Sequence, residues 1–402
     1  MTAPNEIVRI AARGDGVTQD GVHASGAVPG DIVETDGRIT CGPHHVEPAC
    51  KHFGKCGGCE LQHGDDEVLR RFVRERVVNA AEGQGLATGE LYAEHLSPPQ
   101  SRRRAGLHAL RVKGGAVVGY REAGAHRLVD LKECPVLSPD LAALIDPLRE
   151  FVAGHGPTCN VDMALTLCDQ GVDLGLTNFP LEGLAATEAA SAFAADNALA
   201  RLAIDQGYGP ETLWEPQPAT VTLSGLAVSL PAGAFLQATP DAEARMIADA
   251  TEWLGDARIV ADLFAGLGTF AFALAKSSTH GRKVLAVEAE QAAYLACKVA
   301  AAHTGGKVIA LHRDLFRNPL QAAELNRFDA VLLDPPRAGA KSQIAEIAAS
   351  DLSKVLYVSC NPSSWARDGK VLVEAGFSLK RLRPVGQFRW STHVELVSLF
   401  ER

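Results

Sequence analysis

The sequence predicts an α/β protein whose second half is a doubly wound, Rossmann-like sheet. After residue 216, apolar strand patterns alternate with helical patterns, which is typical of a parallel sheet covered by helices on both faces. Residues 6–40 contain short apolar runs broken by Gly and Asp, which indicates a small β-barrel. Between these regions the pattern is mixed and favours a central α+β part. We therefore expect three domains, at 1–48, 49–215 and 216–402.

The composition restricts the class of protein. The chain has 402 residues and a formal net charge of −9, and 47% of its residues are hydrophobic. No run of about 18 apolar residues indicates a membrane span, and the N-terminus lacks the pattern of a signal peptide. We expect a cytoplasmic monomer with no membrane contact and no protein partner. In a reducing compartment, the nine cysteines are expected to be metal ligands, nucleophiles or core residues.

A glycine-rich loop concentrates three of these cysteines. Cys50, Cys56 and Cys59 are separated by five and two residues, and small neighbours let the backbone wrap an inorganic centre. Two kinds of centre fit. Zinc often combines C-x2-C ligands with His, and several His lie nearby. An iron–sulfur cubane needs four thiolates, for which Cys134 is the obvious fourth.

Basic residues gather in the first half of the chain. A helical pattern at 65–82 carries four arginines, and three consecutive arginines at 102–104 precede strand patterns at 107–112 and 116–120. One basic sheet face suits phosphate contacts and favours a nucleic-acid partner over a merely solubilising surface. The Ala-rich stretch 185–206 predicts a helix without recognisable chemistry.

The second half holds the predicted parallel sheet. Thr239 and Pro240 provide an N-cap and a first helical position for the helix that follows. The predicted parallel strands are 258–264, 283–289, 307–313, 329–334 and 354–360, and antiparallel edge strands are predicted at 377–385 and 395–402.

The loop after the first of these strands predicts a nucleoside cofactor. Gly266 and Gly268 let a ligand approach the backbone, but the third Gly of a dinucleotide fingerprint is missing. Glu288 ends the next strand about 20 residues further on, where an acid can hold ribose hydroxyls. S-adenosylmethionine fits this combination.

Two further strand ends carry reactive groups. Asp334 is followed by two prolines, which hold a rigid loop at the carboxyl edge of the sheet. Cys360 ends an apolar strand at 355–358, and Pro362 breaks that strand. A buried structural Cys is the alternative to a nucleophile.

Taken together, these motifs resemble the S-adenosylmethionine-dependent RNA 5-methyluridine methyltransferases over nearly the whole chain. The cysteine loop makes the chain most similar to the iron–sulfur-containing bacterial enzymes of 23S ribosomal RNA. The matching stretches are 53–59, 119–121, 134–137, 235–237, 262–264, 334–337, 359–362 and 393–395.

The resemblance implies a class I methyltransferase domain and assigns its site. Cys360 would attack C6 of the target uracil, and Glu395 would remove the proton from C5. The cofactor and target-base pocket would be lined by Gln237, Phe264, Thr269, Glu288, Asp314 and Asp334.

The resemblance also implies that Cys50, Cys56, Cys59 and Cys134 bind a [4Fe–4S] cluster, and that residues 1–48 form a short TRAM-like RNA-binding barrel. Ribosomal RNA is the expected partner. The alternatives are the same chemistry on transfer RNA, and a non-catalytic RNA-binding factor.

Overall fold

The structure, a computed structural model, describes residues 5–154, 160–277 and 281–402. Among these residues, the largest element is a nine-stranded sheet with the order β18-β17-β16-β19-β20-β22-β21-β6, and β7 also pairs with β21. Neighbours from β18 to β20 are parallel. β22 runs antiparallel between β20 and β21. The prediction of a doubly wound sheet is confirmed, but the runs 377–385 and 395–402 are not edge strands, because β22 lies between β20 and β21, and β21 also pairs with β6 and β7.

The strands of this sheet are β6 (Glu90–Leu91), β7 (His95–Leu96), β16 (Ile259–Leu263), β17 (Lys283–Glu288), β18 (Val308–His312), β19 (Ala330–Leu333), β20 (Lys354–Ser359), β21 (Ser378–Gly386) and β22 (Glu395–Glu401). The helices of this region are α1 (Asp66–Glu82), α5 (Pro240–Leu254), α6 (Thr269–Ser277), α7 (Gln291–Ala301), α8 (Ala322–Leu325), α9 (Lys341–Ala349) and α10 (Pro362–Glu374), with a 3₁₀ turn, η1 (Ala302–Thr304).

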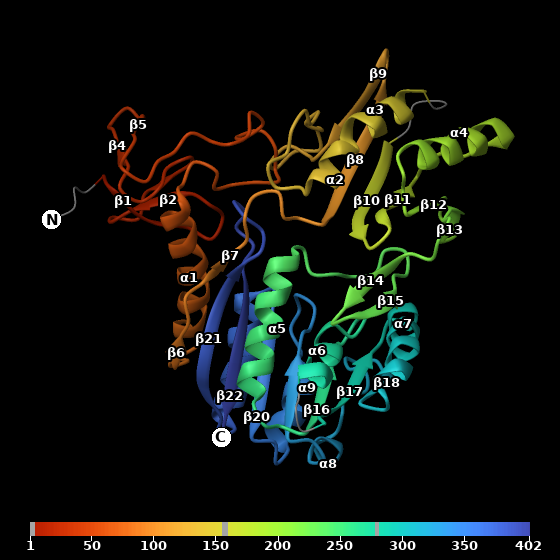
Figure 1. Cartoon of the computed structure of the whole chain (residues 1–402). Helices are drawn as coiled ribbons and strands as arrows, with labels where there is room; N and C mark the ends of the chain where they lie inside the picture. Colours follow the sequence, from red (N-terminus) through yellow and green to blue (C-terminus); the bar gives the residue numbers. More distant parts are fainter. Residues whose placement is uncertain (1–4, 155–159, 278–280) are drawn as a thin grey trace.

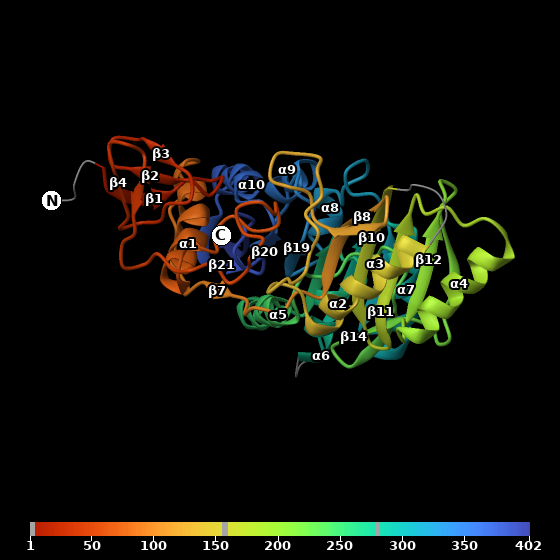
Figure 2. The ribbon, with the colours of Figure 1, turned by 90° about the horizontal axis from the view of Figure 1, so that it is seen from above.

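Helices cover both faces of the sheet because successive strand residues point to opposite sides. Leu332 and Leu356 belong to one core with residues of α5, α6 and α7. Leu333 and Tyr357, their chain neighbours, belong to a second core with residues of α1, α9 and α10. Figure 2, seen from above, shows α5 and the pair α9 and α10 on opposite sides of the strands. Among the helices of the described residues, none is long and apolar enough to cross a membrane.

The carboxyl ends of the parallel strands face the rest of the molecule. The chain terminus after β22 lies at the bottom of Figure 1, and β20 runs antiparallel to β22. The carboxyl end of β20, next to Cys360, therefore lies at the upper edge of the large sheet in Figure 1, beneath the central sheet.

The central part is built on another sheet, six-stranded within the described residues, with the order β13-β12-β11-β10-β8-β9. One prediction here was wrong, because the stretch 185–206 is not one helix. Helix α4 ends at Asp196, and Leu202 and Ile204 are buried in a strand that pairs with β11. The elements are β8 (Arg104–Val112), β9 (Gly115–Gly119), α2 (Pro139–Ala143), α3 (Ile145–Gly154), β10 (Asn160–Cys168), β11 (Gly171–Thr177), α4 (Gly183–Asp196), β12 (Arg201–Asp205) and β13 (Pro210–Trp214), followed by the hairpin β14 (Thr220–Leu223) and β15 (Leu226–Ser229).

The N-terminal region forms small antiparallel sheets. One contains β1 (Ile7–Ile10), β2 (Gly16–Thr18) and β3 (His23–Ala24), and another contains β4 (Ile32–Val33) and β5 (Ile39–Thr40). A bridge between Glu6 and Ile32 links them. The range predicted as central, 49–215, also includes α1, β6 and β7, yet β6 and β7 pair with β21 and α1 packs on the same sheet. In the structure, α1, β6 and β7 therefore lie with the large sheet, although their residues fall within the interval 49–215.

Candidate active site

A cavity of about 690 Å³ opens at the carboxyl edge of the parallel strands. Its walls come from the loops after β16, β17, β18, β19 and β20, from the start of β22 and from the segment before α5. Open α/β sheets bind their ligands at this edge. The predicted site residues that line it are Gln237, Phe264, Thr269, Glu288, Asp334, Cys360 and Glu395.

The loop after β16 is shaped for close contact with a ligand. Phe264, Gly266 and Gly268 have positive φ angles of 65°, 55° and 93°. A Cβ atom on Gly268 would lie 2.6 Å from the Phe272 ring, so this turn requires glycine. Phe264 adopts the same left-handed conformation without being glycine, a strained state that clusters at binding sites.

Glu288 fixes this loop from the next strand. One carboxylate oxygen accepts a hydrogen bond from the Gly266 amide at 2.8 Å, and the other accepts from the amides of Ala289 at 2.8 Å and Glu290 at 2.7 Å. The carboxylate is thereby held at the cavity wall, where a nucleoside ribose would lie.

The loop after β18 holds the side chain of Asp314 against its own backbone. Asp314 is not among the residues that line the cavity. Its carboxylate accepts hydrogen bonds from the amides of Phe316 at 2.9 Å and Arg317 at 3.3 Å, so it shapes the loop. Phe316 lines the cavity instead, and its ring centroid lies 5.4 Å from that of Phe264.

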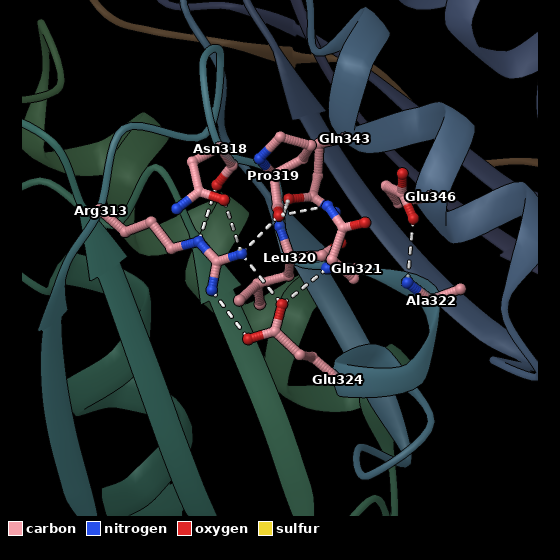
Figure 3. A network of polar contacts seen from close by, with 9 residues as sticks. All are labelled: Arg313, Asn318, Pro319, Leu320, Gln321, Ala322, Glu324, Gln343 and Glu346. Carbon is pink, nitrogen blue, oxygen red and sulfur yellow. Dashed lines mark hydrogen bonds and ion pairs between the residues drawn. The ribbon is translucent and has the colours of Figure 1, made fainter.

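Arg313 holds the loop that carries Phe316. Figure 3 shows its guanidinium directed toward Asn318, Pro319 and Glu324. It donates to the Glu324 carboxylate at 2.8 and 2.9 Å, and to the carbonyls of Asn318 at 2.7 Å and Pro319 at 2.5 Å. Because Arg313 itself lines the cavity, this network links the loop conformation to the cavity wall.

A thiol and two carboxyl groups face the same part of the cavity. Burial, followed by the charges of Glu395 and Asp334, raises the pKa of Cys360 to about 11, whereas Arg337 lowers it. Burial, followed by the charge of Asp334, raises the pKa of Glu395 to about 8. Burial also raises the pKa of Asp334 to about 7. The thiol is therefore protonated at neutral pH in the ligand-free protein, and both carboxyl groups are suited to proton transfer there.

A chain of side-chain amides connects the two carboxyl groups. Gln237 donates to Asp334 at 3.2 Å, and Gln387 donates to the Gln237 carbonyl oxygen at 3.2 Å. The carbonyl oxygen of Gln387 accepts from the Ala238 amide at 3.0 Å, and a hydrogen bond with Gln387 lowers the pKa of Glu395. Gln387 was not predicted, because a single Gln in a loop carries no pattern.

Two other cavity residues were missed for different reasons. Arg337 lies inside a motif that the sequence analysis used, yet only the structure shows that its charge acts on Cys360. Phe316 has no sequence signal at all, because its place depends on the fold of the loop.

The predicted metal ligands share one pocket. Cys50, Cys56, Cys59 and Cys134 line it, together with Arg102 and Tyr120, and all four thiols are free. Burial first, then the neighbouring cysteines, raises the pKa of Cys59 to about 12. Across the described ranges, however, no group of three or more His, Cys, Asp or Glu has the arrangement of a metal site. The four thiols therefore line one pocket, but they do not lie close enough together to form a ready-made metal site.

The sheet order and the cavity at its carboxyl edge define a class I S-adenosylmethionine-dependent methyltransferase. A solved structure with this fold is the tRNA (uracil-54, C5)-methyltransferase of Pyrococcus abyssi in complex with S-adenosyl-L-homocysteine. The TM-score is 0.76, and the match covers 98% of each chain at 21% identity.

Sequence comparisons identify the family. Residues 220–402 match the model described as tRNA (Uracil-5-)-methyltransferase. An uncharacterized RNA methyltransferase of Zymomonas mobilis is 49% identical, over 99% of both chains. The 23S rRNA (uracil(1939)-C(5))-methyltransferase of Edwardsiella ictaluri is 31% identical, over 100% of this chain and 97% of its own length. The chain belongs to the S-adenosylmethionine-dependent RNA 5-methyluridine methyltransferase family.

Proposed function

We propose that this methyltransferase modifies C5 of a uridine in 23S ribosomal RNA through a covalent adduct with Cys360. The observation that supports it best is that Cys360, Glu395 and Asp334 line one cavity with the glycine loop. Ribosomal RNA is favoured because a relative of matching length is named for it. Transfer RNA is the alternative, since the family model carries that name.

The chemistry accounts for the residue types. C5 of uracil is a poor nucleophile. When the Cys360 thiolate adds to C6, the electron pair of the C5–C6 double bond makes an enolate, and C5 can attack a methyl group. S-adenosylmethionine supplies that methyl on a sulfonium, whose sulfur keeps the bonding pair. Glu395 then takes the C5 proton, the double bond forms again, and the thiolate leaves. The uridine has to be unstacked from its RNA to reach this cavity.

Cys360 must lose its proton before it attacks. Arg337 is the cation that favours the thiolate. A bound sulfonium adds a second positive charge to the cavity and would lower the pKa of the thiol and of both carboxyl groups. Asp334 would accept the thiol proton, because Glu395 has to stay unprotonated to take the C5 proton later.

A trapping assay tests the mechanism and the substrate together. The protein is incubated with S-adenosylmethionine and with 23S ribosomal or transfer RNA transcripts containing 5-fluorouridine. Fluorine cannot leave as a proton, so a thioether to C6 should accumulate and be found on Cys360 by denaturing mass spectrometry. If only transfer RNA formed an adduct, the substrate would be transfer RNA rather than ribosomal RNA. If neither RNA formed an adduct, the covalent mechanism would be contradicted.

The [4Fe–4S] proposal is supported by the pocket lined by the four cysteines. Thiolates are the ligands of such clusters. Cys50, Cys56, Cys59 and Cys134 would hold it, and its binding would draw together loops distant in sequence. Arg102 lines the same pocket and also a groove beside the active site, so the cluster would help to position RNA. The small antiparallel sheets within 1–48 support the proposal of a TRAM-like RNA-binding part there, and 49–215, which contains all four cysteines, is proposed as the part that holds the cluster.

Replacing Cys56 with serine should remove the cluster and weaken RNA binding. We expect iron and acid-labile sulfide, about four of each in the reconstituted wild type, to be lost. RNA affinity should fall about tenfold, or about 1.4 kcal/mol, while S-adenosylmethionine affinity is retained. The exposed Cys41 provides the control, Cys41→Ser, which should behave like wild type. A folded Cys56→Ser protein with normal RNA affinity would contradict the positioning role.

Glu324→Gln should weaken cofactor binding without affecting the chemical step. The substitution removes the charged partner of Arg313 and loosens the loop that presents Phe316. Losing about 1 kcal/mol of the cofactor's binding free energy should raise the KM for S-adenosylmethionine about fivefold, with kcat unchanged. Glu346→Gln is a matched control, because Glu346 contacts the Ala322 amide in the same network but not Arg313. Equal effects of the two variants would contradict this role.

A further inference from the structure

Beside the catalytic cavity lies a second cavity of about 330 Å³. Arg102, Arg104, Phe235 and Phe388 line it, and no acidic side chain of the described residues does. The Arg102 guanidinium lies over the Phe388 ring, 5.2 Å from its centroid, and that of Arg104 lies 4.8 Å from the centroid of Phe235. Paired aromatic and guanidinium surfaces are the usual platform for single-stranded nucleic acid.

The three consecutive arginines have different environments because extended backbone alternates its side chains. Arg103 is buried on the opposite side, where it pairs with Glu243 at 2.5 Å and donates to the Gln237 carbonyl at 3.0 Å. It is a structural residue that holds the Gln237 segment. Arg102 and Arg104 face the second cavity.

Among the described residues, no carboxylate forms an ion pair with Arg102 or Arg104 on the cavity side. Burial, followed by Arg102 and Arg103, lowers the pKa of Arg104 to about 10, and no carboxylate offsets these effects. Arg104 donates to the Leu236 carbonyl, and Arg102 donates to the Arg104 carbonyl at 2.8 Å. Burying a charge without an opposite partner is costly, and an anion in the cavity would offset that cost.

The second cavity adjoins the catalytic one. Gly233, Ala234 and Phe235 line both. Gln387, which also lines the second cavity, donates to Gln237 at the wall of the first. An RNA chain with its uridine in the first cavity would therefore present its next nucleotide to the second.

We propose that the second cavity binds the nucleotide adjoining the target uridine, with its phosphate held by Arg102 and Arg104 and its base against Phe388. This inference rests on the proposed function, because it requires the target uridine to occupy the first cavity. It assigns to this cavity the recognition of the sequence next to the modified base.

A double-mutant cycle between protein and RNA tests the stacking contact. The substrate is the transcript that the wild type methylates, with an abasic site placed in turn on the 5′ or 3′ side of the modified uridine. With wild-type enzyme, one abasic site should lower kcat/KM about tenfold, the usual effect of losing one stacked base. Phe388→Leu should cause a similar loss with intact RNA, but the abasic site should cause no further loss in that variant. S-adenosylmethionine affinity should stay at the wild-type value.

The phosphate contact has its own readout. For Arg102→Gln, the plot of log affinity against log salt concentration should become less steep by about 0.7, which corresponds to the loss of one single-strand phosphate contact. Arg258→Gln is the control, because Arg258 is exposed at the amino edge of β16, opposite the cavities. Additive effects of Phe388→Leu and both abasic sites, or unchanged salt slopes, would overturn the inference while the proposed function stands. A wild-type enzyme that methylates neither RNA would overturn both.

Discussion

Cys360→Ser is expected to abolish turnover while S-adenosylmethionine still binds. A serine hydroxyl is a far weaker nucleophile than a thiolate at neutral pH, and the cavity around position 360 contains carboxyl groups that disfavour a further negative charge. We expect kcat to fall by about 10⁴-fold or more, the scale of losing a nucleophile in other enzymes. Methyl transfer from labelled S-adenosylmethionine to RNA measures the rate, and calorimetry measures cofactor affinity.

The controls for Cys360 separate chemistry from folding. Cys41→Ser changes an exposed thiol that does not line the cavity and should retain full activity. The 5-fluorouridine adduct should disappear in Cys360→Ser and persist in Cys41→Ser. If Cys360→Ser kept a tenth of the wild-type rate, another group would have to be the nucleophile, and the adduct mechanism would be wrong.

The sheet was predictable because its strands carry a local signal. The runs at 258–264 and 354–360 contain consecutive apolar residues, at 259–261 and 355–358, as is typical of a strand buried under helices on both faces, and the structure has strands at Ile259–Leu263 and Lys354–Ser359. The stretch 185–206 was wrongly predicted as one helix. Its alanines favour helix throughout, but the residues after Asp196 gain more by burial beside β11 than by helix propensity.

The positions of site residues were predictable where the residue lies directly at the end of a strand. Cys360, Glu395 and Asp334 follow or begin strands, so their common edge follows from the fold. Asp314 as a cofactor contact stays a prediction, because a loop decides whether a side chain faces the cavity or its own backbone, and its carboxylate accepts from the amides of Phe316 and Arg317. Contacts between distant segments, such as that of Gln387 with Gln237, leave no trace in the local pattern.

Glu395→Gln is expected to stop the reaction after methyl transfer. Gln has nearly the shape of Glu but cannot accept the C5 proton, so the methylated adduct should form and fail to release Cys360. Turnover should fall by about 10²–10⁴-fold, the usual contribution of a general base. A single turnover should still transfer about one methyl per enzyme into a covalent complex with ordinary uridine RNA, which denaturing gels and mass spectrometry detect. Asp334→Asn is the comparison, because it removes the other carboxylate of the cavity.

The pH profile distinguishes a base from a structural carboxylate at position 395. Burial and Asp334 raise the pKa of Glu395 to about 8, so its charged, proton-accepting form gains population as pH rises through that value. Wild-type adduct release should therefore become faster as pH rises through about 8 and should level off only above that value, where Glu395 is fully ionised. Glu395→Gln should lack this rise and accumulate adduct at every pH. If Asp334→Asn accumulated the adduct and Glu395→Gln did not, the base would be Asp334, which accepts a hydrogen bond from Gln237 in the same cavity.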